Sequence, residues 1–285
     1  MLERLRRSLI TLGVLGVAFY LGAAVWLRFN EKRIIYQPEV GSDVRVAGPS
    51  DPDWQRVTLT TADGVRLVGI VLPASDLDGF WLLDFHGNAG SVWSRLQHHA
   101  YDGFHALGLN VLAVDYRGYG ESDSRPPDEA GLHADARACY DWLRRAREVP
   151  ADRIVLYGHS LGSGPATELA TRVPAAALVL EGAFTTVTER GAELYWWLPV
   201  RWLATQRFAN VEKIGRVTIP KLLMHAIDDE VIPYAHGRRL FAAAHSPKQW
   251  ADLSGGHNDA RGAAWQAALG SFLGRLQPSR TLTPE

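Results

Sequence analysis

The sequence is poor in cysteine and in net charge. Cys139 is its only cysteine, which excludes an intrachain disulfide and a cysteine-cluster metal site. Cys139 falls in a helical pattern, where we expect it to be a small core residue. The formal net charge of −1 at pH 7 gives no indication of nucleic-acid binding. No internal repeat is visible, and 285 residues suit one large domain or two small ones.

One long uncharged apolar run is present near the N-terminus. Residues 8–27 contain no charged side chain, and about 20 apolar residues suffice for a helix to cross a bilayer. We interpret residues 1–30 as a single-pass membrane anchor; the alternatives are a cleaved signal peptide and a buried core helix. The arginines before the run, with the free amine, favour a cytoplasmic N-terminus and an extracytoplasmic main domain.

Residues 31–277 are predicted to form one domain, followed by a polar, disordered tail at 278–285. After a hairpin at 55–72, short apolar runs alternate with helical patterns. Continuous apolar strands separated by amphipathic helices predict an α/β fold with a mostly parallel sheet, covered by helices on both faces. In such a sheet the ligand site lies beyond the carboxyl ends of the strands.

Residues that can carry chemistry follow the ends of the predicted strands. They are His86, Asp115, Ser160, Glu181, Asp229 and His257. Ser160 stands in Gly158-His159-Ser160-Leu161-Gly162, the G-x-S-x-G pattern of a nucleophile elbow. Such a turn exposes the serine hydroxyl, which is a weak nucleophile unless a base lies beside it.

A serine hydrolase also needs a base, an acid and an oxyanion hole. In this fold type the acid and then the histidine follow the serine along the chain, which favours His257, in a glycine loop before the last helix, as the base. Asp229, Asp228 and Glu181 are all possible acids, and the residues alone do not choose among them. The expected oxyanion donors are the backbone N–H groups of Leu161 and Asn88.

Six motifs together resemble the α/β-hydrolase fold superfamily, in particular its membrane-anchored branch of bud-emergence-type hydrolases and protein depalmitoylases. The motifs are H-G-N-A-G at His86, D-Y-R-G-Y-G-E-S at Asp115, G-H-S-L-G-S around Ser160, E-G-A-F-T-T at Glu181, D-x-x-I-P ending at Pro233 and G-G-H-N-D around His257. The resemblance implies Asp229 as the acid, because the family places it four residues before a proline. Ala226 departs from the glycine that is usual in that motif.

The implied activity is hydrolysis of carboxylic esters or thioesters, with apolar acyl groups as the expected substrates, through an acyl-enzyme and without metal or cofactor. The alternatives are a peptidase or acyltransferase on the same triad, and a non-catalytic membrane-tethered binding protein. Some depalmitoylases carry a cysteine-rich N-terminus that this chain lacks, so their substrate does not transfer directly.

A short flap is predicted at about 185–219, and it is rich in tryptophan. Trp196 and Trp197 of this flap, and Trp93 near the oxyanion loop, are candidates for lining a substrate pocket. The flap could instead touch the bilayer. The interpretation that we favour from the sequence is an ordinary amphipathic helix that packs its tryptophans into the core.

Overall fold

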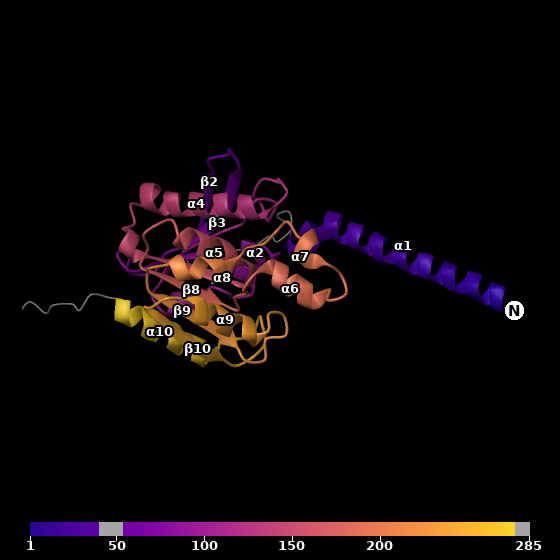
Figure 1. The fold of residues 1–285 in the computed structure, drawn as a ribbon. Coiled ribbons are helices and arrows are strands. Elements are labelled where there is room, and N and C mark those ends of the chain that lie inside the picture. The colour runs from indigo at the N-terminus through magenta and orange to yellow at the C-terminus, as the bar shows by residue number, and fades with distance from the viewer. Residues whose placement is uncertain (40–53, 277–285) are drawn as a thin grey trace, which may run out of the picture.

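The computed structural model describes residues 1–39 and 54–276, so the predicted tail at 278–285 lies outside the described residues. Its first helix, α1 (Leu2–Ile35), is continuous and projects from the rest of the molecule (Figure 1). This helix passes residue 30, where we expected the anchor to end. Lys32 and Arg33 lie in its last turn, where positive charge complements the helix dipole.

Eight strands form one sheet in the order β10-β9-β8-β7-β4-β6-β3-β2. β2 and β3 form an antiparallel hairpin, β3 is also antiparallel to β6, and the remaining neighbours are parallel. The mostly parallel sheet predicted from the sequence is therefore confirmed. The strands are β2 (Gln55–Thr60), β3 (Arg66–Leu72), β4 (Trp81–Phe85), β6 (Asn110–Val114), β7 (Ile154–His159), β8 (Ala177–Glu181), β9 (Lys221–Ala226) and β10 (Lys248–Leu253). Two further short strands, β1 (Gln37–Pro38) and β5 (Ala89–Gly90), pair with each other.

Helices cover both faces of the sheet and bury two separate apolar clusters. On one face lie α4 (Glu129–Ala146), α5 (Ser163–Ala170), α8 (Asn210–Lys213) and α9 (Tyr234–Ala243). On the other lie α2 (Val92–Gln97), α3 (Asp102–Ala106) and α10 (Ala263–Leu276). Short 3-10 turns are η1 (Ala151–Arg153), η2 (Ser160–Gly162) and η3 (Ile214–Arg216). Four strands of the sheet, β4, β6, β7 and β8, are buried at every position, as a sheet covered on both faces requires.

Residues 91–106 could form one helix by their pattern, but the chain makes two short helices there, α2 and α3. Ser91 is the N-cap of α2, since its side chain accepts from the Ser94 N–H at 3.2 Å. The chain breaks at His99, whose φ is +56°. Val92 and Tyr101 are both buried, but nine residues of uninterrupted helix would put them about half a turn apart on opposite sides. The break lets both side chains reach the core.

The predicted flap at 185–219 contains α6 (Val187–Leu194) and α7 (Val200–Leu203), followed by α8 and η3. Leu198 and Val200 of this segment form a small apolar cluster with Ala24 and Leu27 of α1. The flap is thus packed against the C-terminal part of α1 (Figure 1).

Candidate active site

Ser160 occupies a strained turn between β7 and α5. Its φ is +52°, a left-handed value that is costly for a residue with a side chain. The flanking glycines permit this turn: a Cβ on Gly162 would lie 1.8 Å from the Phe85 carbonyl oxygen, and one on Gly158 would lie 2.6 Å from the Gly162 carbonyl. Both glycines are therefore required by close approach of backbone to backbone.

A chain of hydrogen bonds joins Ser160, His257 and Asp229. The Ser160 Oγ lies 2.8 Å from His257 Nε2, and His257 Nδ1 lies 2.7 Å from Asp229 Oδ2. Because the carboxylate can only accept, we assign the proton to Nδ1, which leaves Nε2 free to accept from the serine. All three residues are buried. The geometry is that of a nucleophile, a general base and an orienting acid.

Asp229 is held as an ionised acceptor by several donors. Its Oδ1 accepts the N–H groups of Val231 at 2.9 Å and Ile232 at 2.7 Å. Burial by itself would raise the pKa of Asp229, but hydrogen bonds from His225, His257 and the Ile232 N–H outweigh it and hold the pKa well below its ordinary value. A carboxylate in this state can orient the imidazole and stabilise the imidazolium.

His225 is a residue of this site whose role the sequence patterns did not indicate. Its Nε2–H donates to the Ile232 carbonyl at 2.8 Å and lies 3.4 Å from Asp229 Oδ2. The ring thus braces the loop that carries Asp229. The spacing of four residues between His225 and Asp229 at the end of β9 was the available signal, but that spacing identifies a structural partner only when the path of the loop is known.

The two other candidate acids lie in different environments. Glu181 is buried and accepts from Arg261 Nε at 2.9 Å and from the Tyr157 hydroxyl. Although burial favours the neutral acid, the charge of Arg261 lowers the pKa of Glu181. Asp228 is exposed. Only Asp229 faces His257 among the three.

The turn after β4 lies beside the serine. A Cβ on Gly87 would be 3.5 Å from Ser160 Cβ. The turn is fixed through its carbonyl groups, because the Tyr116 hydroxyl donates to the His86 carbonyl at 3.0 Å and the Tyr119 hydroxyl donates to the Asn88 carbonyl at 2.9 Å. The assignment of the oxyanion hole to the backbone N–H groups of Leu161 and Asn88 stays a prediction.

His86 and Asp115, also predicted at strand ends, do not join the triad. Burial lowers the pKa of His86 to about 3, so the ring is neutral, and its Nδ1 lies 2.8 Å from the Gly87 carbonyl. Asp115 accepts the Val92 N–H at 2.7 Å. Both side chains connect the strand ends to the loops around the site.

The tryptophans differ from the interpretation that we favoured. Trp93 is buried and packs edge-on against Trp54, with ring centroids 5.4 Å apart. Trp196 is 81% exposed, and Trp202 of the same flap is 90% exposed, so the prediction that the flap packs its tryptophans into the core is wrong. The flap packs Leu198 and Val200 against α1, while Trp196 stands in the turn between α6 and α7 and Trp202 is two residues, or about 200° of helix, from the buried Val200. The role of Trp93, Trp196 and Trp197 in a substrate pocket stays a prediction.

Comparison with known proteins defines the class. Residues 81–214 match the alpha/beta hydrolase fold family. The human alpha/beta hydrolase domain-containing protein 17B is 30% identical over 219 residues, which are 76% of this chain and 72% of the relative. The chain therefore belongs to the α/β-hydrolase family and is a hydrolase, in the branch that the sequence motifs indicated.

Two further proteins resemble the chain along most of its length. An uncharacterized protein of Mycobacterium tuberculosis is 40% identical over 240 residues, 84% of each chain. The structure of a Pyrococcus furiosus esterase superposes with a TM-score of 0.67 at 19% identity, covering 85% of this chain and 98% of the esterase. At 19% identity, the superposition with the esterase shows a shared fold.

Proposed function

We propose that the protein is a serine hydrolase that cleaves carboxylic esters or thioesters of apolar acyl groups. His257 Nε2 takes the proton of the Ser160 hydroxyl as Oγ attacks the acyl carbonyl, and the imidazolium is stabilised by Asp229. The backbone N–H groups of Leu161 and Asn88 hold the oxyanion. His257 then protonates the leaving group, and water, activated by the same imidazole, releases the acid from the acyl-enzyme.

The observation that carries this proposal is the continuous hydrogen-bonded chain from Ser160 to Asp229, with 2.8 Å and 2.7 Å between successive partners. These distances are within the range for a base that activates a nucleophile. Backbone strain in proteins is concentrated at functional sites. The strained, left-handed backbone of Ser160 therefore supports the same assignment.

We propose further that α1 anchors the enzyme as a single-pass membrane protein with its catalytic domain outside the cytoplasm. The most apolar 18-residue window of α1 has a mean hydropathy of 2.0 and none of it is buried against the domain. An apolar acyl substrate suits an enzyme attached to a bilayer.

The proposal is tested by labelling with a fluorophosphonate, which reacts covalently with activated serines. The purified wild-type chain is expected to label, while Ser160→Ala and His257→Ala lose labelling and keep their circular dichroism spectra. Asp228→Asn is the matched control, because this exposed carboxylate adjoins Asp229 and is expected to leave labelling unchanged. A folded wild-type chain that fails to label, or a Ser160→Ala variant that still labels, contradicts the proposal.

Substrate class is tested with acyl esters and thioesters of increasing chain length, together with the corresponding amides. We expect kcat/KM to rise with the length of the acyl chain and to be far lower for amides. Preference for amides would identify a peptidase, and transfer to an added alcohol in place of water would identify an acyltransferase.

A further inference from the structure

The tip of the flap, residues 194–203, exposes large apolar side chains. The exposed fractions are 55% for Leu194, 81% for Trp196 and 90% for Trp202. Exposed apolar side chains scattered singly are ordinary on a protein surface, but a group of them on one short segment marks an interaction site. Tryptophan is also the residue most typical of the region where a membrane meets water.

The flap tip contacts α1 well inside its apolar run. Trp197 stacks on Phe19, with ring centroids 6.3 Å apart and planes within 9°, and lies 6.5 Å from the ring of Tyr20. Phe19 precedes Leu27, the end of the apolar run, by eight residues, or about 12 Å of helix. If the bilayer ended where Trp197 touches α1, only about 11 residues of the run would remain, too few to cross it.

A buried carboxylate fixes this arrangement. Glu31, near the end of α1, accepts the backbone N–H of Thr205 at 2.8 and 2.9 Å and that of Gln206 at 2.9 Å, and it also accepts the Thr205 hydroxyl at 2.6 Å. These donors directly follow α7. The flap cannot move away from α1 without leaving Glu31 unsatisfied, which is costly for a buried charge.

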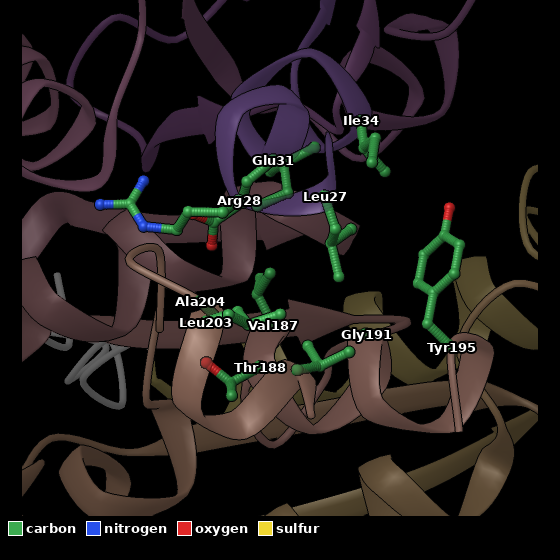
Figure 2. Close-up of a pocket in the computed structure, with 12 residues that line it drawn as sticks. Leu27, Arg28, Glu31, Ile34, Val187, Thr188, Gly191, Tyr195, Leu203 and Ala204 are labelled. Carbon is green, nitrogen blue, oxygen red and sulfur yellow. The ribbon is translucent and has the colours of Figure 1, made fainter. Parts of the chain in front are cut away.

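An apolar pocket that opens to solvent lies between α1 and the flap helices, with about 420 Å³ of space when the open part is included. Its walls are mostly aliphatic and come from Leu27, Ile34, Val187 and Leu203 among others, with Arg28 and Glu31 of α1 also at the pocket (Figure 2). Figure 1 places α6 and α7 beside the end of α1 that joins the domain. Apolar walls beside a membrane helix suit the hydrocarbon chain of a lipid.

We infer that the flap tip lies within the bilayer, so that residues 194–203 and the domain end of α1 form one continuous lipid-binding surface. This rests on the proposed anchoring by α1. The exposed Trp196 and Trp202 lie in the headgroup region and upper hydrocarbon, and the pocket between α1 and the flap takes an acyl chain of a membrane lipid. The catalytic domain is therefore partly embedded, rather than suspended on a flexible tether.

The test uses the full chain in phosphatidylcholine vesicles and a fluorophore on a single introduced cysteine. Trp202→Cys places the probe on the flap tip. Leu77→Cys is the matched control, because Leu77 is 61% exposed and lies on the loop that leads into β4, at the end of the sheet where the parallel strands begin. The native Cys139 is buried, so the wild-type chain measures background labelling. Quenching is measured with nitroxide-labelled phosphatidylcholine and with aqueous iodide.

We expect nitroxide lipid to quench the probe at position 202 and iodide to leave it bright, with the reverse at position 77. Iodide quenching at position 202 as strong as at position 77 overturns the inference. Protection from both quenchers also overturns it, since a second protein copy would then cover the flap.

Two parallel measurements separate this inference from the proposals beneath it. Intact mass and resistance to alkaline extraction report whether α1 is retained and anchored. Fluorophosphonate labelling of the two cysteine variants reports whether the triad works. Iodide quenching in an anchored, active variant refutes flap insertion alone.

Discussion

At the scale of single residues, the carboxylate of Asp229 serves only as a hydrogen-bond acceptor. Its two oxygens receive N–H groups from Val231, Ile232 and His257. An amide at this position could turn its own N–H₂ toward His257 and reverse the imidazole tautomer, so that Nε2 would carry a proton and could not take one from Ser160.

Asp229→Asn is therefore expected to lower kcat by about 10⁴-fold with little change in folding. The measurement is steady-state hydrolysis of a soluble chromogenic ester, with Asp228→Asn as the control. A loss smaller than about tenfold would show that His257 is oriented by other contacts.

A second residue-scale expectation concerns pH. Burial raises the pKa of Asp115 to about 7, whereas the pKa of the same carboxyl in the unfolded chain is about 4. The folded state therefore binds more protons than the unfolded state between these values, and the free energy of unfolding contributed by Asp115 falls as pH rises through this window.

We expect Asp115→Asn to remove this contribution, so that its stability changes less than that of the wild type between about pH 5 and pH 8. Urea unfolding at several pH values measures the difference. The depressed pKa of Asp229 acts with the opposite sign and only at lower pH, so it does not enter this window. If the free energy of unfolding changed with pH equally in the wild type and in Asp115→Asn, the raised pKa of Asp115 would be refuted.

At the scale of elements, Arg117 links the β2–β3 hairpin to α4. Its guanidinium donates to Asp135 of α4 at 2.8 and 2.9 Å and to Asp63 of the hairpin turn at 2.9 and 3.1 Å. The side chains of Arg117 and Asp135 are 6% and 1% exposed. Removing Asp135 leaves the buried guanidinium with Asp63 alone, whose side chain is 43% exposed, and a buried charge that loses a partner is costly.

Asp135→Ala is expected to lower the free energy of unfolding by about 3–5 kcal/mol. The matched control on the same helix is Arg137→Ala, which removes an exposed pair with Asp141 and should cost at most about 1 kcal/mol. Chemical denaturation of both variants checks the contrast. Equal losses would mean that Arg117 finds other acceptors.

The strands and most helices could be predicted because their signals are local. β7 is a continuous apolar run ended by a glycine pattern, and Ser91 marks the start of α2. The break at His99 could not be predicted, because it depends on Val92 and Tyr101 sharing one core beneath the sheet. The exposure of Trp196 and Trp202 depends likewise on α1, which lies more than 150 residues away in the sequence.

At the scale of the molecule, the order of the residues along the chain and the ends of the predicted strands were sufficient to predict that Ser160 and His257 share one site, and the two side chains are in contact. The choice of acid needed the family motif, and Asp229 does lie beside His257 in the folded chain. The brace from His225 and the hydrogen bonds around Glu31 were not predictable, because each joins backbone groups whose positions only the folded loops define.

The orientation in the membrane is a property of the whole chain and gives the last prediction. Arg4, Arg6 and Arg7 with the free amine precede the apolar run, which favours a cytoplasmic N-terminus. We expect Leu77→Cys, on the main domain, to react with a membrane-impermeant maleimide in intact cells. Leu2→Cys, at a position that is 82% exposed, should react only after permeabilisation. The reverse pattern would place the catalytic domain in the cytoplasm, and recovery of a chain without α1 would identify a cleaved signal peptide.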